Sequence, residues 1–151
     1  MKYWLAAFAF VLVYFGYERF DVTVQADAGV RQEVLDDREV AGNNALQQAF
    51  EQRKSNLLVE GRGRVAKLLS DDHNGSRHQR FILNVSPRQT VLIAHNIDLA
   101  PRIEGLAEGD EIIFSGQYEW NNKGGVVHWT HHDPQGRHPG GWLRHQGRIY
   151  Q

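Results

Sequence analysis

The chain of 151 residues contains no cysteine and carries almost no net charge. Without cysteine it has no disulfides, no thiolate nucleophile and no cysteine-ligated zinc or iron–sulfur site. Its 17 basic and 18 acidic residues leave a formal net charge of -1, so the whole molecule produces no strong field that would steer nucleic acid or anionic membranes toward it. Hydrophobic residues make up 41% of the chain, which is enough for one modest core but does not call for a second domain.

The most apolar stretch of the sequence lies at the N-terminus. Lys2 is followed by an uncharged, mostly apolar run, residues 3–17, and then by Glu18 and Arg19. A membrane-spanning helix needs roughly 17 to 25 residues, and a signal peptide has an apolar core of about 7 to 15. Aromatic residues at both ends of the run suit membrane interfaces, and the nearest Ala-x-Ala, residues 26–28, lies far beyond it. We therefore expect residues 1–20 to be an uncleaved signal anchor.

This anchor would place the chain in a bacterial inner membrane, as a single-pass protein with its domain in the periplasm. The alternative is a cleaved signal peptide, which would give a periplasmic or secreted protein. The next segment, residues 21–44, is polar and acidic and includes the pair Asn43 and Asn44, so we interpret it as a linker. Residues 45–54 place apolar side chains at helical spacing, which predicts a short amphipathic helix at the start of the folded domain, residues 45–151.

From residue 56 onward, apolar residues recur at every second position, which is the period of β-strands. Strands are predicted at residues 57–69, 80–85, 90–96, 111–120 and 126–131, with a last hairpin around residues 146 and 147. Residues 98–106 predict a short helix between the third and fourth strands, with Asp98 in position to cap it. This order, with a long first strand broken by Gly61 and Gly63, is typical of a mainly β domain of the OB-like barrel type.

Two stretches of this domain carry a resemblance to a known family. Residues 90–102 and 119–142 resemble a family of small exported bacterial proteins, which is classed among the domains of unknown function. The resemblance extends from residue 78 to the C-terminus and so covers most of the domain. It implies no reaction, because no activity is established for that family.

Histidine is concentrated near the C-terminus. Five of the eight histidines lie in residues 121–151, a stretch that contains four Lys/Arg residues and a single Asp. Glycines and tryptophans surround them, which indicates either a shaped polar site or a dense internal hydrogen-bond network. Because imidazole is the commonest transition-metal ligand, a Zn²⁺ or other divalent-ion site is one hypothesis. On a strand His131 faces away from His128, so a common site needs a turn at Asp133 and Pro134. The candidate metal ligands are His128, His131, His132, Asp133 and His138.

A metal-dependent phosphodiesterase or nuclease is a sharper hypothesis for the same segment. It would use a histidine as base, Asp133 to orient it, and Arg137 or Arg144 to stabilise a phosphate oxygen. However, the sequence shows no serine or cysteine in a nucleophile elbow, and no helix follows the histidines as strand–strand–helix metal nucleases require. We therefore expect a binding protein rather than an enzyme.

OB-like barrels hold extended ligands across one face with aromatic platforms and basic side chains. The partners considered are single-stranded nucleic acid, a glycan or an envelope protein, and a purely structural role in the envelope is the alternative. The aromatic and basic residues available on the strands and loops are Tyr118, Trp120, Trp129, Trp142, Arg62, Arg64, Lys67 and Arg80. The candidate ligand-binding residues are His95, Asn96, Trp120, His128, Trp129, His131, His132, Asp133, Arg137, His138 and Trp142.

Overall fold

The computed structural model describes the backbone of residues 4–73 and 75–151, and the side chains of residues 27–73 and 75–151. Its first element is the helix α1 (Trp4–Glu51). The chain divides into two units, residues 1–37 and residues 38–151, and α1 runs through the boundary. The predicted membrane anchor begins outside the described residues, and none of its side chains is described. Within the described residues, no helix is long and apolar enough to cross a membrane.

The second unit contains a closed β-barrel. Its strands are β1 (Leu57–Leu68), β2 (His78–Ser86), β3 (Gln89–Asn96), β4 (Glu111–Glu119), β5 (Val126–His128), β6 (Trp142–His145) and β7 (Arg148–Tyr150). In the sheet the order is β1-β2-β3-β5-β4-β6-β7, and β4 also pairs with β1, which closes five strands into a barrel. Strands β3 and β5 run parallel to each other. This topology confirms the prediction of a mainly β domain with an OB-like barrel.

The long first strand serves both halves of the barrel, as predicted. Residues 57–64 of β1 pair with β4, and residues 64–68 pair with β2. A register shift between Val65 and Lys67 marks the point where the strand bends from one partner toward the other. The inward-facing side chains of the strands form one core. Those with no exposed surface are Phe81, Leu83, Val91, Ile93, Ile112, Phe114, Tyr118, Val127 and Leu143.

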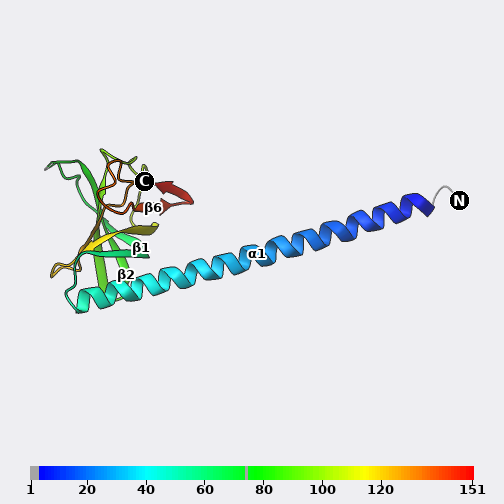
Figure 1. Cartoon of the computed structure of the whole chain (residues 1–151), viewed down its shortest axis with the longest axis horizontal. Coiled ribbons are helices and arrows are strands. Elements are labelled where there is room, and N and C mark those ends of the chain that lie inside the picture. Colours follow the sequence, from blue (N-terminus) through cyan, green and yellow to red (C-terminus); the bar gives the residue numbers. More distant parts are fainter. Residues whose placement is uncertain (1–3, 74) are drawn as a thin grey trace. The chain divides into compact units, whose positions relative to one another are not determined.

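The last turns of α1 pack on this barrel, beside β1 and β2 (Figure 1). Leu46 and Ala49 are buried in the barrel core, as the amphipathic pattern of residues 45–54 predicts. The helix ends at Glu51, three residues before the predicted end at residue 54.

The segment that we interpret as a linker, residues 21–44, is helical and belongs to α1. Contacts with the barrel account for the helical state of its last residues, whose local propensity is poor. A Cβ on Gly42 would lie 1.6 Å from the Glu60 carbonyl oxygen, so glycine is what lets the helix backbone approach β1. The Asn43 side chain donates to the carbonyl of Arg62 at 2.9 Å and accepts from the Arg62 amide at 3.1 Å. The buried Glu39 carboxylate forms ion pairs with two guanidinium groups, at 3.2 Å between its oxygen and a nitrogen of Arg62 and at 3.0 Å to a nitrogen of Arg144.

The short helix predicted at residues 98–106 does not form, and turns join β3 to β4 instead. One helix-like hydrogen bond, from the Ala100 amide to the Asn96 carbonyl at 3.1 Å, starts the segment. Pro101 stops it, because a proline disfavours the helical region for the residue before it. Asp98 does not cap a helix but binds the loop before β2, where it accepts from the Arg77 amide and guanidinium at 2.7 Å each.

Candidate functional site

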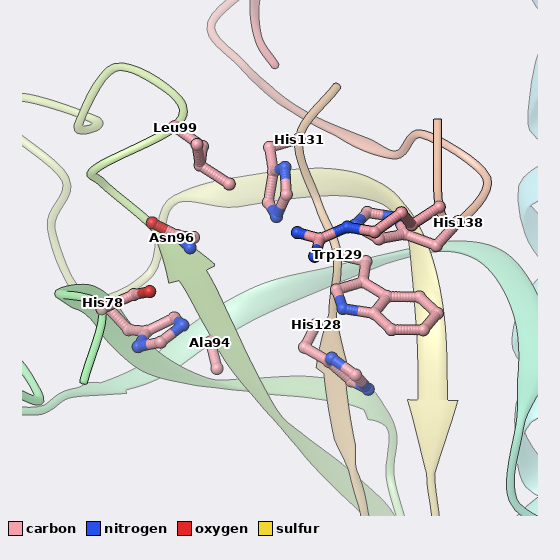
Figure 2. A pocket seen from close by; sticks show the side chains of 10 residues that line it. His78, Ala94, Asn96, Leu99, His128, Trp129, His131 and His138 are labelled. Carbon is pink, nitrogen blue, oxygen red and sulfur yellow. The ribbon is translucent and has the colours of Figure 1, made fainter. Parts of the chain in front are cut away.

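A cleft opens on the outside of the barrel, where the start of β2, the end of β3 and the segment after β5 meet. Its volume is about 420 Å³. Figure 2 shows His78, Ala94 and Asn96 on the side of β2 and β3, and His128, Trp129 and His138 on the other. The cleft is lined by Ser76, His78, Ala94, Asn96, Leu99, His128, Trp129, His131, Arg137 and His138.

A left-handed residue brings the histidines after β5 to this cleft. The predicted strand over residues 126–131 ends at His128 instead, because Trp129 adopts a φ of 54°. Strand alternation would have directed His128 and His131 to opposite faces. The turn at Trp129 cancels that alternation, and both imidazoles line the cleft.

Asp133 holds the loop that follows. Its carboxylate accepts hydrogen bonds from the backbone amides of Gln135 at 2.9 Å, His138 at 3.0 Å and Arg137. These amide donors, the Gln135 amide first, lower the pKa of Asp133 to about 2. The loop places the His138 ring flat against Trp129, with centroids 4.1 Å apart and planes 8° from parallel. Asp133 therefore shapes one wall of the cleft without lining it.

Backbone carbonyls fix the orientation of two imidazoles. Nδ1 of His131 lies 2.8 Å from the His132 carbonyl oxygen, and Nδ1 of His138 lies 2.9 Å from the Pro139 carbonyl oxygen. A carbonyl oxygen only accepts, so Nδ1–H is the donor in both cases and the neutral rings carry their lone pair on Nε2. Burial lowers the pKa of His128, and the Glu119 carboxylate, 3.9 Å from its Nε2, opposes part of this effect.

Arg137 therefore supplies the permanent positive charge of the cleft. Its side chain is exposed, and its backbone amide is held by Asp133. Among the described residues that line the cleft, none is an aspartate or glutamate. The result is a partly aromatic recess with a guanidinium and four imidazoles on its walls.

The structure does not assemble the candidate metal ligands into a metal site. Within the described residues there is no group of three or more His, Asp or Glu side chains that could hold a metal ion. The Asp133 contacts contribute to this, because the carboxylate oxygens of this candidate accept hydrogen bonds from backbone amides. His132 is exposed outside the cleft.

One family model matches this chain. The family described as "Protein of unknown function (DUF3465)" matches residues 29–151. The chain belongs to the DUF3465 family. The match covers the end of α1 and the whole barrel, so the resemblance to a domain of unknown function is confirmed. A comparison with curated proteins gave no match.

The DUF3465 cleft contains Asn96, His128, Trp129, His131, Arg137 and His138 from our candidates, and the others lie elsewhere. His95 is fully buried beneath the cleft, with Nδ1 2.9 Å from the Thr130 hydroxyl and Nε2 3.1 Å from the Pro101 carbonyl. Trp120 donates from Nε1 to the Phe50 carbonyl at 3.1 Å and so fastens the end of α1. Trp142 pairs with β4 at the start of β6.

Of the other aromatic and basic candidates, all but Lys67 make structural contacts. Tyr118 lies in the core. Arg62 pairs with Glu39, and Arg64 lies 3.8 Å from Glu111. Arg80 donates to the Ser70 carbonyl at 3.0 and 3.1 Å, which braces the loop between β1 and β2.

Four residues of the cleft were absent from our candidates: Ser76, His78, Ala94 and Leu99. His78 could have been found. The sequence predicts a second strand from residue 80, but β2 starts at His78. The period of two then directs His78, Arg80 and Ile82 to the same outer face. Leu99 had no local signal, because its position depends on the turns that replace the predicted helix.

Proposed function

We propose that the DUF3465 domain is a binding module and that its cleft holds single-stranded nucleic acid. The observation that carries the proposal is the lining itself, in which Arg137 and four histidines meet with no carboxylate among the described lining residues. A guanidinium binds phosphate oxygens through charge-assisted hydrogen bonds. The anionic backbone of a polynucleotide therefore finds an attractive charge in this recess.

The imidazoles and the tryptophan favour a nucleic acid over an acidic glycan. The Nε2 lone pair of His131 is available to accept a hydrogen bond, and the amino and imino groups of unpaired bases donate such bonds. Nε2 of His138 lies 3.8 Å from the Asp133 carboxylate, so His138 contributes through its ring. Trp129, backed by the His138 ring, offers a flat surface at the cleft wall for a base or a sugar. In OB folds the outer face of the second and third strands is where oligonucleotides and oligosaccharides bind, and the cleft lies at one end of that face.

The test is the substitution Arg137→Gln, with Arg148→Gln as the control. Both remove one positive charge, but Arg148 lies in β7 over the Tyr150 ring, away from the cleft. We expect Arg137→Gln to raise the Kd for a labelled single strand of roughly 12 nucleotides, within the usual OB-fold site size, by about 5- to 10-fold. The slope of log K against log salt concentration should fall by about 0.7, the value for one phosphate of a single strand. Fluorescence anisotropy measures both quantities.

Arg148→Gln should leave the Kd within about 2-fold of the parent chain, because an exposed charge far from the site acts only through a screened field. Equal losses in the two variants would show that binding depends on overall charge and not on the cleft. No binding by the parent chain, or equal binding of an acidic polysaccharide, would overturn the proposed ligand. If the parent chain does not bind, a protein partner or a structural role replaces nucleic acid in the proposal. If an acidic polysaccharide binds equally well, a glycan replaces it.

We also propose that residues 3–17 anchor the chain in a bacterial inner membrane, with the barrel in the periplasm. The support is the uncharged, aromatic-flanked run of the sequence between Lys2 and Glu18. A domain in that place meets nucleic acid during uptake or scavenging. The proposal predicts that the chain sediments with membranes, keeps Met1 by mass spectrometry, and loses its barrel when protease is added to spheroplasts.

Two results would contradict the anchor. A mature chain that begins near residue 29 would indicate a cleaved signal peptide. Protection of the barrel from external protease, with cleavage only after lysis, would place the domain in the cytoplasm. A variant that lacks residues 2–20 is the matched control, because it should stay in the cytoplasm and remain protected.

A further inference from the structure

A second hollow lies on the same outer face of the barrel, and neither the cleft nor the family description accounts for it. Its volume is about 280 Å³. Leu69, Ile82 and Leu92 make its apolar floor, and Thr90 and Lys123 stand at its edge. Half-buried leucine and isoleucine on the outside of a strand have no core to fill, so this apolar surface is available to a ligand.

The loop that carries Lys123 is held rigidly over the hollow. The Asn121 side chain accepts from the amides of Lys123 at 2.8 Å and Gly125 at 3.1 Å. The buried Tyr118 hydroxyl donates to the Gly124 carbonyl at 3.2 Å, and the Leu92 amide donates to the Gly125 carbonyl at 3.0 Å. A loop fixed at this many points holds the backbone of Lys123 in one place, which reduces the loop entropy that is lost when a ligand binds there.

The strand register makes the hollow and the cleft neighbours. Leu92 and Ala94 point outward in succession along β3, since Val91, Ile93 and His95 are buried, and Asn96, which is also buried, follows at the wall of the cleft. Leu92 belongs to the hollow, whereas Ala94 and Asn96 belong to the cleft. Two residues along a strand span about 7 Å. One extended ligand can therefore enter both sites without leaving the face of β2 and β3.

Positively charged side chains lie on both sides of the hollow, as an anionic extended ligand requires. Lys67, exposed at the end of β1, is directly opposite Ile82 in the register of β1 and β2. Lys123 lies on the opposite side, in the loop between β4 and β5. As in the cleft, no carboxylate is among the described residues that line the hollow. An apolar floor between two ammonium groups fits a planar, uncharged group joined to anions on either side.

We infer that the hollow over Ile82 and Leu92 is a second subsite, which takes one base of a single strand while the neighbouring backbone lies in the cleft. The inference rests on the proposed function and deepens it, because it gives the ligand a register on the barrel. Lys67 and Lys123 contact the phosphates on either side of that base. Apolar contact with the base face does not depend on its edge, so the subsite accepts any base, with a preference for purines because they bury more surface.

The experiment is a scan of a single strand in which one abasic position is moved along the chain. The strand is shortened to the minimum length that keeps the affinity of the parent chain, so that it binds in one register. With the full-length parent chain, one abasic position besides the one that faces Trp129 should weaken binding by about 5- to 10-fold more than the rest. With Leu92→Thr, which keeps a β-forming residue but removes apolar surface, that excess should fall below about 2-fold.

Lys123→Gln is the second variant and does not touch the floor of the hollow. It should lower the salt slope by about 0.7 while it keeps the excess penalty at the same abasic position. Ile149→Thr is the matched control for Leu92→Thr, because Ile149 is an exposed strand residue of β7 outside both sites. Its scan should equal that of the parent chain.

A scan with no excess penalty besides the one at Trp129, or a second excess penalty that persists in Leu92→Thr, would overturn the second subsite. The proposed function would survive that result if Arg137→Gln still weakened binding. If the parent chain binds no oligonucleotide, the proposed function fails and the subsite with it. If Leu92→Thr unfolds, the Lys123→Gln salt slope decides, and an unchanged slope overturns the subsite.

Discussion

Gly125→Ala is expected to destabilise the DUF3465 domain by about 3 to 5 kcal/mol, a large fraction of the roughly 5 to 15 kcal/mol that stabilises an ordinary domain. The added Cβ would lie 2.1 Å from the ring of Tyr118. That ring cannot move aside, because Tyr118 has no exposed surface and its hydroxyl donates to the Gly124 carbonyl. The φ of +94° at Gly125 adds a further penalty for any side chain. Urea unfolding followed by tryptophan fluorescence measures the change.

Gly109→Ala measures the cost of the left-handed backbone conformation without the steric overlap between an added Cβ and Tyr118. Gly109 has a φ of +93°, almost the same as that of Gly125, yet nothing lies within 4 Å of an added Cβ. This control should lose only about 1 to 2 kcal/mol, the cost of a left-handed conformation for an alanine. Similar losses in the two variants would mean that Tyr118 does not hold the loop between β4 and β5, and would remove the support for a rigidly placed Lys123.

The free energy of unfolding is expected to fall by about 3 kcal/mol between pH 7 and pH 4 because of His95 alone. Burial lowers the pKa of His95 from 6.5 to about 4, partly offset by its bond to the Pro101 carbonyl. The unfolded chain therefore binds a proton at a pH where the native state does not. Stability is complete above pH 6.5, declines as the pH falls toward 4, and changes little below that value on account of this group.

The measurement is the unfolding free energy of the parent chain and of His95→Gln at several pH values from 7 to 4. The variant is less stable at pH 7, because Gln replaces a ring that bonds at both nitrogens. Its stability should depend less on pH, with about 3 kcal/mol of the decline removed. His73→Gln is the control, since His73 is exposed and the variant should follow the parent curve. Parallel curves for the parent chain and His95→Gln would contradict the assignment.

Acidic groups do not confuse this comparison, because both chains contain them. The Gln117 side chain lowers the pKa of Glu119 from 4.5, so Glu119 loses part of its contribution within this range in both chains alike. The pKa of Asp133 is about 2, and hydrogen bonds to Ala107 and His145 lower the pKa of Asp110. A carboxyl whose pKa is lowered in the native state loses its contribution only as the pH falls below its unfolded value of 3.8. His128, whose pKa is lowered by burial, acts in the same direction as His95 and remains in both chains. The difference between the two curves therefore reports His95.

Local patterns of the sequence were sufficient for most strands of the barrel. Alternation of apolar and polar residues is a property of neighbours in the chain, so the strands near residues 57–69, 80–85, 90–96 and 111–120 could be found from it. The final turn at Gln146 and Gly147 was likewise found from turn-forming residues, and β6 and β7 flank it. The order of these elements then indicated an OB-like barrel, because few folds combine it with so long a first strand.

Local signals misled where a contact distant in sequence decides the conformation. Gly42 and Asn43 have the composition of a linker, yet they are helical because Glu60 and Arg62 of β1 lie against them. His95 and Trp120 have the chemistry of ligand-binding residues, yet Thr130, Pro101 and Phe50 occupy their polar atoms. No window of neighbouring residues contains these partners.

The sequence by itself determined that the chain forms a β-barrel and that a polar, histidine-rich segment follows its fifth strand. Only the tertiary structure decided which of those residues share a cleft. The left-handed Trp129 turns His131 to the same side as His128, and the end of β3 and the start of β2 bring Asn96 and His78 to meet them. Alternation and propensity act within a few residues, whereas a site is made by the pairing of strands whose separation in sequence carries no local signal.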